Sequence, residues 1–266
     1  MIKLTQERVK DVLAYMEDDL PNCLYLYGDI IRYGVDDPNM TVWYSEKDGD
    51  INAVVMKYFS GSHVYSKKLD YELAEIVEKL QEIDPDRISS QREIIERLSP
   101  ILKSEYGVEY GVVFRGSCYR KFKSYALVER AGPEDADAIA DLLLTHETFS
   151  KTYEKSTLAQ ELADRMTNGI GRSYVIRDGG RVIAHDGVSL ETDKYMVLSL
   201  ALVHDDYRKT MYGAILESYM LNELGKEGKE IYFMISQKQR SDGHERMGNQ
   251  VVADYGKLFK RTLEKD

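Results

Sequence analysis

The stretch Met196–Leu224, MVLSLALVHDDYRKTMYGAILESYMLNEL, reads as a strand, a polar turn and a helix in succession. Its first eight residues, MVLSLALV, are uncharged and have the length of a strand, which predicts a central strand buried on both faces. After the turn, apolar residues recur at three- and four-residue spacing, which predicts a helix with a buried stripe of Gly213, Leu216, Met220, Leu221 and Leu224. Glycines and lysines follow, as is common where a helix ends.

The turn between this strand and this helix has the composition of an anion-binding site. Arg208 and Lys209 supply two positive charges, and Gly213 falls in the first turn of the helix, where a backbone without a side chain can approach a ligand. The first amides of a helix have no partners within it, and the helix dipole adds positive potential there. The other interpretation is a buried strand–helix pair with two solvated cations.

The same residues resemble the acyl-CoA pyrophosphate signature of the GNAT superfamily of N-acyltransferases, Arg/Gln-x-x-Gly-x-Gly/Ala. Tyr207-Arg208 and Gly213-Ala214 match that signature. Asp205 stands where the family usually has proline, and Lys209 and Met211 stand where it usually has glycine. The resemblance therefore implies the GNAT fold with a CoA loop that has departed from the family pattern.

Length and composition limit the class of protein. A chain of 266 residues suits one large domain or two small ones, and 43% hydrophobic with 31% charged residues is typical of a folded globular protein. The net charge of −10 argues against nucleic acid as the main partner. The N-terminus lacks the apolar core of a signal peptide, and two cysteines, Cys23 and Cys118, do not make a disulfide framework or a metal site. We therefore expect a cytoplasmic protein without a metal.

The first half of the chain predicts alternating helices and strands. Residues 1–20 have a helical apolar period, 23–34 read as a strand, and 41–66 read as a meander of three strands. Helices are expected at 71–81 and 90–101, and a strand at 106–115. This rhythm is similar to that of GNAT family members that carry a second, degenerate copy of the fold, here without a basic turn after any strand.

The second half restarts after a basic segment, 116–124, which we interpret as a linker. From Tyr125 onward the pattern predicts a strand, two helices, three antiparallel strands, a helix, a strand, a helix and a strand, with Thr157 in a capping box that opens the second helix. This is the GNAT order, and "AGPEDADAIADLL", "GRSYVIRDGGRVIAH" and "HERMGN" resemble its further phrases. We therefore predict an α/β fold of the α+β type, a mixed and mostly antiparallel sheet flanked by helices. It forms two tandem copies, a degenerate domain at 1–120 and an acyl-CoA-binding domain at 125–266.

The resemblance implies where acetyl-CoA binds. The strand of the opening stretch would separate from its neighbour, and the backbone of Leu202 and Val203 would bond the pantetheine arm as an added strand. The pyrophosphate would lie on the amides of Lys209, Thr210, Met211, Tyr212, Gly213 and Ala214, beside Arg208. Gln237 stands where the family often has an asparagine that reaches the same arm.

The candidate catalytic residues also come from the resemblance. Acyl transfer to an amine needs a neutral nucleophile, and a carboxylate or a water chain commonly removes its proton. Glu191 closes the strand before the opening stretch and is the candidate base, with Asp193 as its neighbour and competitor. The other interpretation, which the residues alone favour, is that both are solvated acids in a hairpin turn. His244 stands where the family has a tyrosine acid. The other four histidines, at 63, 146, 185 and 204, show no metal-ligand spacing and are read as ordinary surface or core residues.

These observations predict an N-acetyltransferase that uses acetyl-CoA as acyl donor and a primary amine of a small molecule or peptide as acceptor. The acidic composition favours a cationic acceptor, and neither nucleic acid nor a membrane is expected as a partner. The alternative is a non-catalytic protein of the GNAT fold that binds or regulates, with an eroded CoA site.

Overall fold

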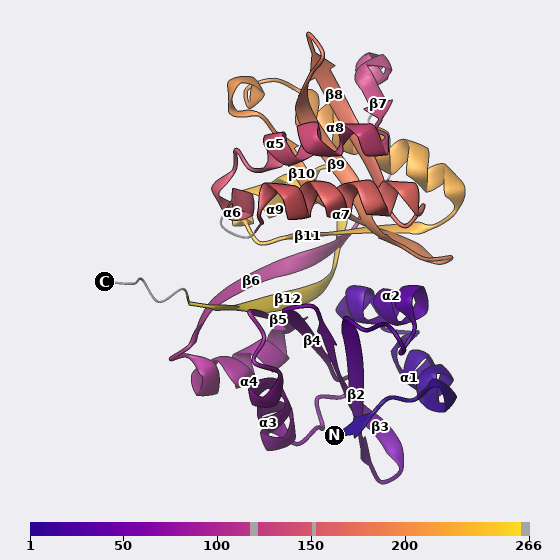
Figure 1. Cartoon of the computed structure of the whole chain (residues 1–266), viewed down its shortest axis with the longest axis vertical. Coiled ribbons are helices and arrows are strands. Elements are labelled where there is room, and N and C mark those ends of the chain that lie inside the picture. The colour runs from indigo at the N-terminus through magenta and orange to yellow at the C-terminus, as the bar shows by residue number, and fades with distance from the viewer. Residues whose placement is uncertain (118–121, 151–152, 262–266) are drawn as a thin grey trace. The chain divides into compact units, whose positions relative to one another are not determined.

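The computed structural model describes residues 1–117, 122–150 and 153–261, which fold into two compact units (Figure 1). Unit 1 comprises Met1–Val113, Ile235–Asp242 and the segment from Val251, and unit 2 comprises Phe114–Met234 and Gly243–Gln250. No helix within the described residues is both long enough and apolar enough to cross a bilayer. Each unit is a sheet with helices on both faces.

Unit 1 contains the strand order β1-β2-β3-β4-β5-β12-β6. Its strands are β1 (Ile2–Lys3), β2 (Met40–Lys47), β3 (Asp50–Tyr58), β4 (Gly61–Tyr65), β5 (Arg87–Gln91), β6 (Tyr106–Arg115) and β12 (Gln250–Lys260). Its helices are α1 (Val9–Met16), α2 (Leu24–Tyr33), α3 (Leu73–Ile83) and α4 (Arg92–Leu102). Strands β1 with β2, β2 with β3, β3 with β4, and β5 with β12 pair antiparallel, whereas β4 and β5 are parallel.

The main core of unit 1 lies between one face of this sheet and helices α3 and α4. Strand alternation directs Val55, Val64, Ile88 and Leu258 to this face, where they meet apolar residues of the two helices. Helices α1 and α2 lie on the other face (Figure 1).

Unit 2 contains the strand order β11-β10-β9-β8-β7. Its strands are β7 (Val128–Arg130), β8 (Arg172–Asp178), β9 (Arg181–Glu191), β10 (Tyr195–Val203) and β11 (Glu230–Ile235). Its helices are α5 (Ala136–Leu143), α6 (Glu147–Ser150), α7 (Lys155–Thr167) and α8 (Tyr212–Leu224), and α9 (Lys238–Arg246) follows β11. All pairs are antiparallel except β10 with β11, which are parallel.

Helices α5 and α7 cover one face of the unit 2 sheet and α8 covers the other (Figure 1). The α5–α7 face has a core that includes Ile139, Leu162 and Val175. On α8 the predicted stripe is confirmed at Leu216, Met220, Leu221 and Leu224, which are all buried, whereas Gly213 is half-buried.

The fold class is confirmed, with particular differences in the elements. Residues 23–34 were expected to be a strand but form α2, because Leu24, Tyr27 and Ile30 are buried at a helical spacing. The helix ends at Gly34, whose φ of 70° favours glycine. The expected helix at 90–101 begins at Arg92 and is preceded by a strand, β5, that the sequence did not reveal.

Smaller corrections concern the second half. The expected strand near Tyr125 starts at Val128, after a 3-10 helix at Lys123–Leu127. Thr157 lies inside α7, which starts at Lys155 without a side-chain cap, so the capping-box prediction is wrong. Cys118 and part of the proposed linker, residues 118–121, lie outside the described residues.

The two units repeat one order of elements. After an initial strand, each has helices, a three-strand meander, a helix, a strand parallel to the last meander strand, and a further helix and strand. The last strand of the chain, β12, pairs with β5 of unit 1, from Tyr255↔Gln91 to Phe259↔Arg87. The compact units therefore do not follow the sequence division into residues 1–120 and 125–266, because unit 1 also includes Ile235–Asp242 and the segment from Val251.

Candidate functional site

Strand β10 follows its parallel neighbour β11 for only part of its length. The two strands pair from Tyr195↔Glu230 to Leu198↔Phe233, and no further pairs between them are found in the described part of the chain. On its other side β10 continues to pair with β9, as far as Val203↔Ala184. The last five residues of β10 therefore present a free backbone edge, which is the kind of edge that accepts an extended ligand.

A β-bulge lies where β10 leaves β11. Between Ser199↔Gly187 and Leu202↔His185, β10 has one more residue than β9, and Leu200 takes a φ of 64°. The carbonyl oxygen of Leu200 lies 2.9 Å from Nδ1 of His185, and Nε2 of that ring lies 3.1 Å from the Ser173 hydroxyl. The bulge is thus bound by a side chain on the strand beside it.

Burial lowers the pKa of His185 to about 4, from the ordinary value of 6.5. Because the folded protein resists protonation of this ring and the unfolded chain does not, its contribution to stability is complete above pH 6.5 and is lost as the pH falls towards 4. We expect this loss to amount to roughly 3 kcal/mol. Urea unfolding of wild type and His185→Asn between pH 7 and 4 should show a shallower decline in the variant; parallel curves would contradict the assignment.

The loop after β10 is compact and is attached to the β8–β9 hairpin. A 3-10 helix spans Asp205–Tyr207, and α8 begins at Tyr212. Tyr207 donates a hydrogen bond to Asp178 at 2.6 Å, and Thr210 donates one to the Tyr207 carbonyl at 2.6 Å. These bonds fix the approach of the chain to the first turn of α8.

The loop exposes several amides at the start of α8. The Thr210 and Tyr212 amides bond within the loop, whereas no acceptor is found among the described residues for the amides of Lys209, Met211, Gly213 and Ala214. The Met211 side chain is 55% exposed and directed into solvent. A Cβ on Gly213 would lie 3.3 Å from Val203, so glycine allows α8 to pack closely on β10. Free amides at the start of a helix suit an anion.

The charges around the loop are balanced. Arg208 forms an ion pair with Asp205 at 2.7 Å, both largely exposed. Arg181 bonds the ring of His204 at 2.7 Å, and His204 in turn approaches Asp206. A phosphate would therefore compete with Asp205 for Arg208.

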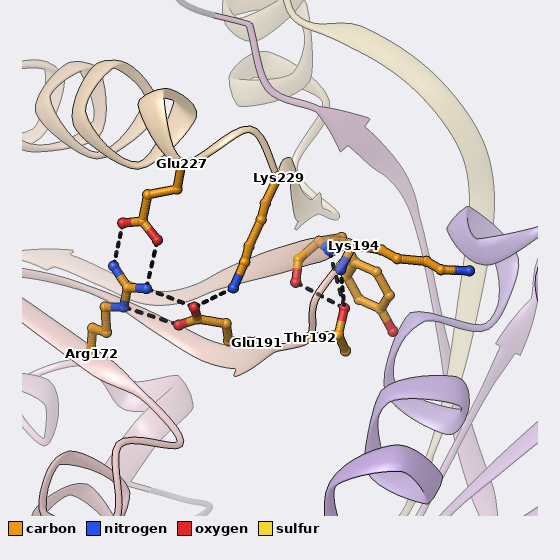
Figure 2. A network of polar contacts seen from close by, with 7 residues as sticks. Arg172, Glu191, Thr192, Lys194, Glu227 and Lys229 are labelled. Carbon is orange, nitrogen blue, oxygen red and sulfur yellow. Dashed lines mark hydrogen bonds and ion pairs between the residues drawn. The ribbon is translucent and has the colours of Figure 1, made fainter.

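Glu191 is part of a cluster of four charged residues (Figure 2). Its two oxygens accept hydrogen bonds from Arg172, at 2.6 and 3.0 Å, and one of them also accepts from Lys229 at 2.7 Å. Arg172 also bonds Glu227 at 2.5 and 2.8 Å, and this holds the pKa of Glu227 below its usual range. Glu191 pairs with Met196 of β10. Met196 precedes the bulge residue Leu200 by four residues, which corresponds to roughly 13 Å along the strand. The arrangement is that of an ion-pair cluster that joins β8 and β9 to the segment between α8 and β11.

His244 is buried rather than open to solvent. Its Nδ1 lies 3.0 Å from Oε1 of Glu217 on α8, and its ring packs on Phe233 and Phe114 at centroid distances of 4.9 and 5.5 Å. Asp193, the competitor of Glu191, is exposed in the turn before β10.

The remaining predicted residues lie as follows. Leu202 and Val203 are half-buried at the end of β10, where the edge is free. Gln237 is exposed after β11, in the segment that belongs to unit 1. Within the described residues no group of three or more side chains is arranged to hold a metal ion.

The corresponding position in unit 1 is closed by its own side chains. Strand β4 pairs with β5 from Gly61↔Arg87 to Val64↔Ser90, and the buried Ser66 amide that follows donates to Oε1 of Gln91 at 3.1 Å. The Ser66 hydroxyl bonds the Asn52 carbonyl at 2.6 Å. In the described part of unit 1, the backbone that follows β4 is therefore already bonded at Ser66.

Two features of the site were missed in the sequence. His185 was read as an ordinary residue, although a histidine inside the apolar strand RVIAHDGVSL signals a buried polar group that needs partners. Arg172 was not singled out, and nothing in its sequence neighbourhood identifies its two acidic partners.

Comparison with known proteins shows similarity at the level of structure. No family model and no curated protein matches the sequence. Among solved structures, a Drosophila protein is 14% identical with a TM-score of 0.70, covering 97% of each chain. A tandem GNAT protein from the clavulanic acid biosynthesis pathway is 11% identical with a TM-score of 0.62, covering 97% of this chain and 96% of that one. A GCN5-related N-acetyltransferase-like protein from Streptococcus suis is 10% identical with a TM-score of 0.62, covering 96% and 99%. The chain is thus a protein of the GNAT fold, with two tandem copies of that fold.

Proposed function

We propose that unit 2 binds acetyl-CoA and transfers its acetyl group to a primary amine of a small molecule or peptide. The observation that carries this proposal is the edge of β10 beyond Leu198. This edge continues into a loop at the start of α8 whose amides find no acceptor among the described residues. Leu202 and Val203 would bond the pantetheine arm through their backbones. The amides from Lys209 to Ala214, with Arg208, would hold the pyrophosphate.

In the proposed reaction the amine nitrogen attacks the thioester carbonyl carbon. The new C–N bond forms, the C–S bond breaks, and the sulfur leaves as a thiolate that takes up a proton to give CoA. The attacking amine loses its proton to water or to a carboxylate. Glu191 is the proposed carboxylate, and it would act from within its ion pairs with Arg172 and Lys229.

Thermal unfolding with acetyl-CoA tests the binding half of the proposal. Ligand at 100 times its dissociation constant should stabilise the fold by about 2.7 kcal/mol. Unit 1 is proposed to bind none, because the end of its β4 is closed by Gln91. A melting temperature unchanged by millimolar acetyl-CoA and by longer acyl-CoAs would refute the proposal.

We expect Asp205→Asn and Arg208→Ala to change CoA affinity in opposite directions. The first removes the carboxylate that competes for Arg208 and should tighten binding several-fold. The second removes one charge-assisted contact and should weaken binding by about 1–3 kcal/mol, while the helix amides remain. Calorimetric titration with CoA measures both. Tighter binding by Arg208→Ala would contradict the phosphate site.

One observation favours a second function: the side chains of both candidate catalytic residues already contact other charged residues of the protein. Glu191 is bound by two cations and His244 is buried against Glu217. A non-catalytic protein of this fold, which binds acyl-CoA and regulates, is consistent with that arrangement. The Glu191→Gln variant separates the two functions: a fall in turnover of about 100-fold at constant CoA affinity supports catalysis. Binding of acetyl-CoA without acetylation of any amine in a broad acceptor screen supports the second function.

A further inference from the structure

The protonation of the His185 ring follows from its two partners. The Leu200 carbonyl can only accept a hydrogen bond, so Nδ1, 2.9 Å away, carries the proton. Nε2 of the neutral ring then accepts from the Ser173 hydroxyl at 3.1 Å. The ring is 1% exposed, and Arg165 and Arg172 line the same small pocket, so a neutral ring is the form that suits this place.

The neighbouring glycine makes room for this ring. A Cβ on Gly187 would lie 3.3 Å from Cε1 of His185 and 3.1 Å from the Arg172 carbonyl. Gly187 and His185 lie on β9 opposite the two ends of the bulge at Leu200, so β9 places a hydrogen-bonded ring against it.

A peptide group is planar, and its C=O and N–H point in opposite directions. Because His185 binds the Leu200 carbonyl, the same peptide directs the N–H of Ala201 away from His185. Ala201 is exposed, and it lies in the part of β10 that has left β11. The orientation of this one amide is therefore set by a side chain on another strand.

We propose that His185 is a positioning residue for the acyl donor: by holding the Leu200 carbonyl it presents the Ala201 N–H to the thioester carbonyl oxygen. This inference rests on the proposed binding of acetyl-CoA to unit 2. An amide aimed at that oxygen stabilises the negative charge that develops on it when an amine attacks. His185 does not touch the substrate, and it acts through the Leu200–Ala201 peptide.

The test is ¹³C NMR of acetyl-CoA labelled at the thioester carbonyl, which needs no acceptor amine. The carbonyl resonance should move on binding to wild type, because a hydrogen bond polarises the C=O group. His185→Asn keeps an N–H donor near the position of Nδ1 and should retain at least half of this shift. His185→Phe removes the donor and should lose the shift, and its affinity for acetyl-CoA should fall three- to tenfold. Its affinity for CoA without an acyl group should stay within threefold.

His63→Asn is the control, because it makes the same substitution at a half-buried imidazole in unit 1. The control should leave the carbonyl shift unchanged. A shift retained in His185→Phe, or no shift in a wild type that binds acetyl-CoA, would overturn the inference and leave the proposed function standing. A wild type that binds neither CoA nor acetyl-CoA would overturn both.

Two measurements keep the inference testable if His185→Phe does not fold. The ¹⁵N resonances of His185 in wild type should show the proton on Nδ1, and a proton on Nε2 alone would refute the geometry. Ser173→Ala removes only the hydrogen bond to Nε2 of His185. This variant should fold, and the displacement of the ¹³C carbonyl resonance on binding should be smaller than in wild type but not zero. If Ser173→Ala loses the hydrogen bond to Nε2 and still gives the wild-type displacement of the thioester carbonyl resonance, the positioning role is refuted.

Discussion

Deletion of residues 251–266 is expected to unfold unit 1, although these residues lie at the opposite end of the chain from it. They include most of β12, which pairs with β5 from Tyr255 to Phe259 and buries Tyr255 and Leu258. Each of these two side chains is worth about 1.5–3 kcal/mol on burial, and the strand hydrogen bonds add about 1 kcal/mol each. The sum is comparable with the whole stability of a typical domain, about 5–15 kcal/mol. Circular dichroism and urea unfolding of the truncated chain measure the loss.

A single substitution tests the same strand without a deletion. At Gly256 an added Cβ would lie 2.9–3.0 Å from three side-chain atoms of Ile95, so Gly256→Ala should destabilise the protein by about 1–3 kcal/mol. Gly107→Ala is the matched control on β6, because the nearest atom to its Cβ would be 3.9 Å away. Equal stability of the two variants, or a truncated chain that unfolds like wild type, would show that β12 does not complete unit 1.

Arg172→Met is expected to destabilise unit 2 by about 3 kcal/mol, because it leaves two carboxylates partly buried with a single lysine between them. The Arg172 and Glu191 side chains are 17% and 15% exposed, and their bonds are the bidentate kind that desolvated pairs use. Since Arg172 lowers the pKa of Glu227, stability from that contact is present above the ordinary carboxyl pKa and is lost at lower pH. The variant should therefore differ from wild type most at neutral pH. Urea unfolding at pH 7 and pH 3.5 measures this.

Lys226→Met is the control for Arg172→Met. Lys226 forms an ion pair with Glu223 at 2.5 Å, but its side chain is 61% exposed, so its loss should cost less than about 1 kcal/mol. If Arg172→Met costs no more than this control, Glu191 is not held by the cluster, and its role as a free base becomes the better interpretation.

The sequence alone determined those parts of the protein that depend on local pattern. The sequence predicted β10 from the uncharged run between Met196 and Val203, and it predicted α8 from the apolar spacing after Gly213. Both patterns are local, because they depend only on which faces of a strand or helix are buried. The order of elements then led to the fold class. Gly213 was expected to let the backbone approach a ligand, and the structure adds that a Cβ there would lie 3.3 Å from Val203. Where local preference and packing disagreed, as in α2, the sequence reading failed.

The tertiary structure alone decided the pairing of distant groups. Strand β12 pairs with residues more than 160 positions earlier, and no local pattern specifies that partner. The position of Glu191 at a strand end suggests a base, yet its partners Arg172 and Lys229 come from 19 and 38 residues away and hold it in ion pairs. His185 reaches the Leu200 carbonyl only because a bulge, itself a product of the mismatch between β9 and β10, turns that carbonyl towards it. Local periodicity records burial, but the partner of a buried polar group is set by the register between strands, and that register exists only in the folded chain.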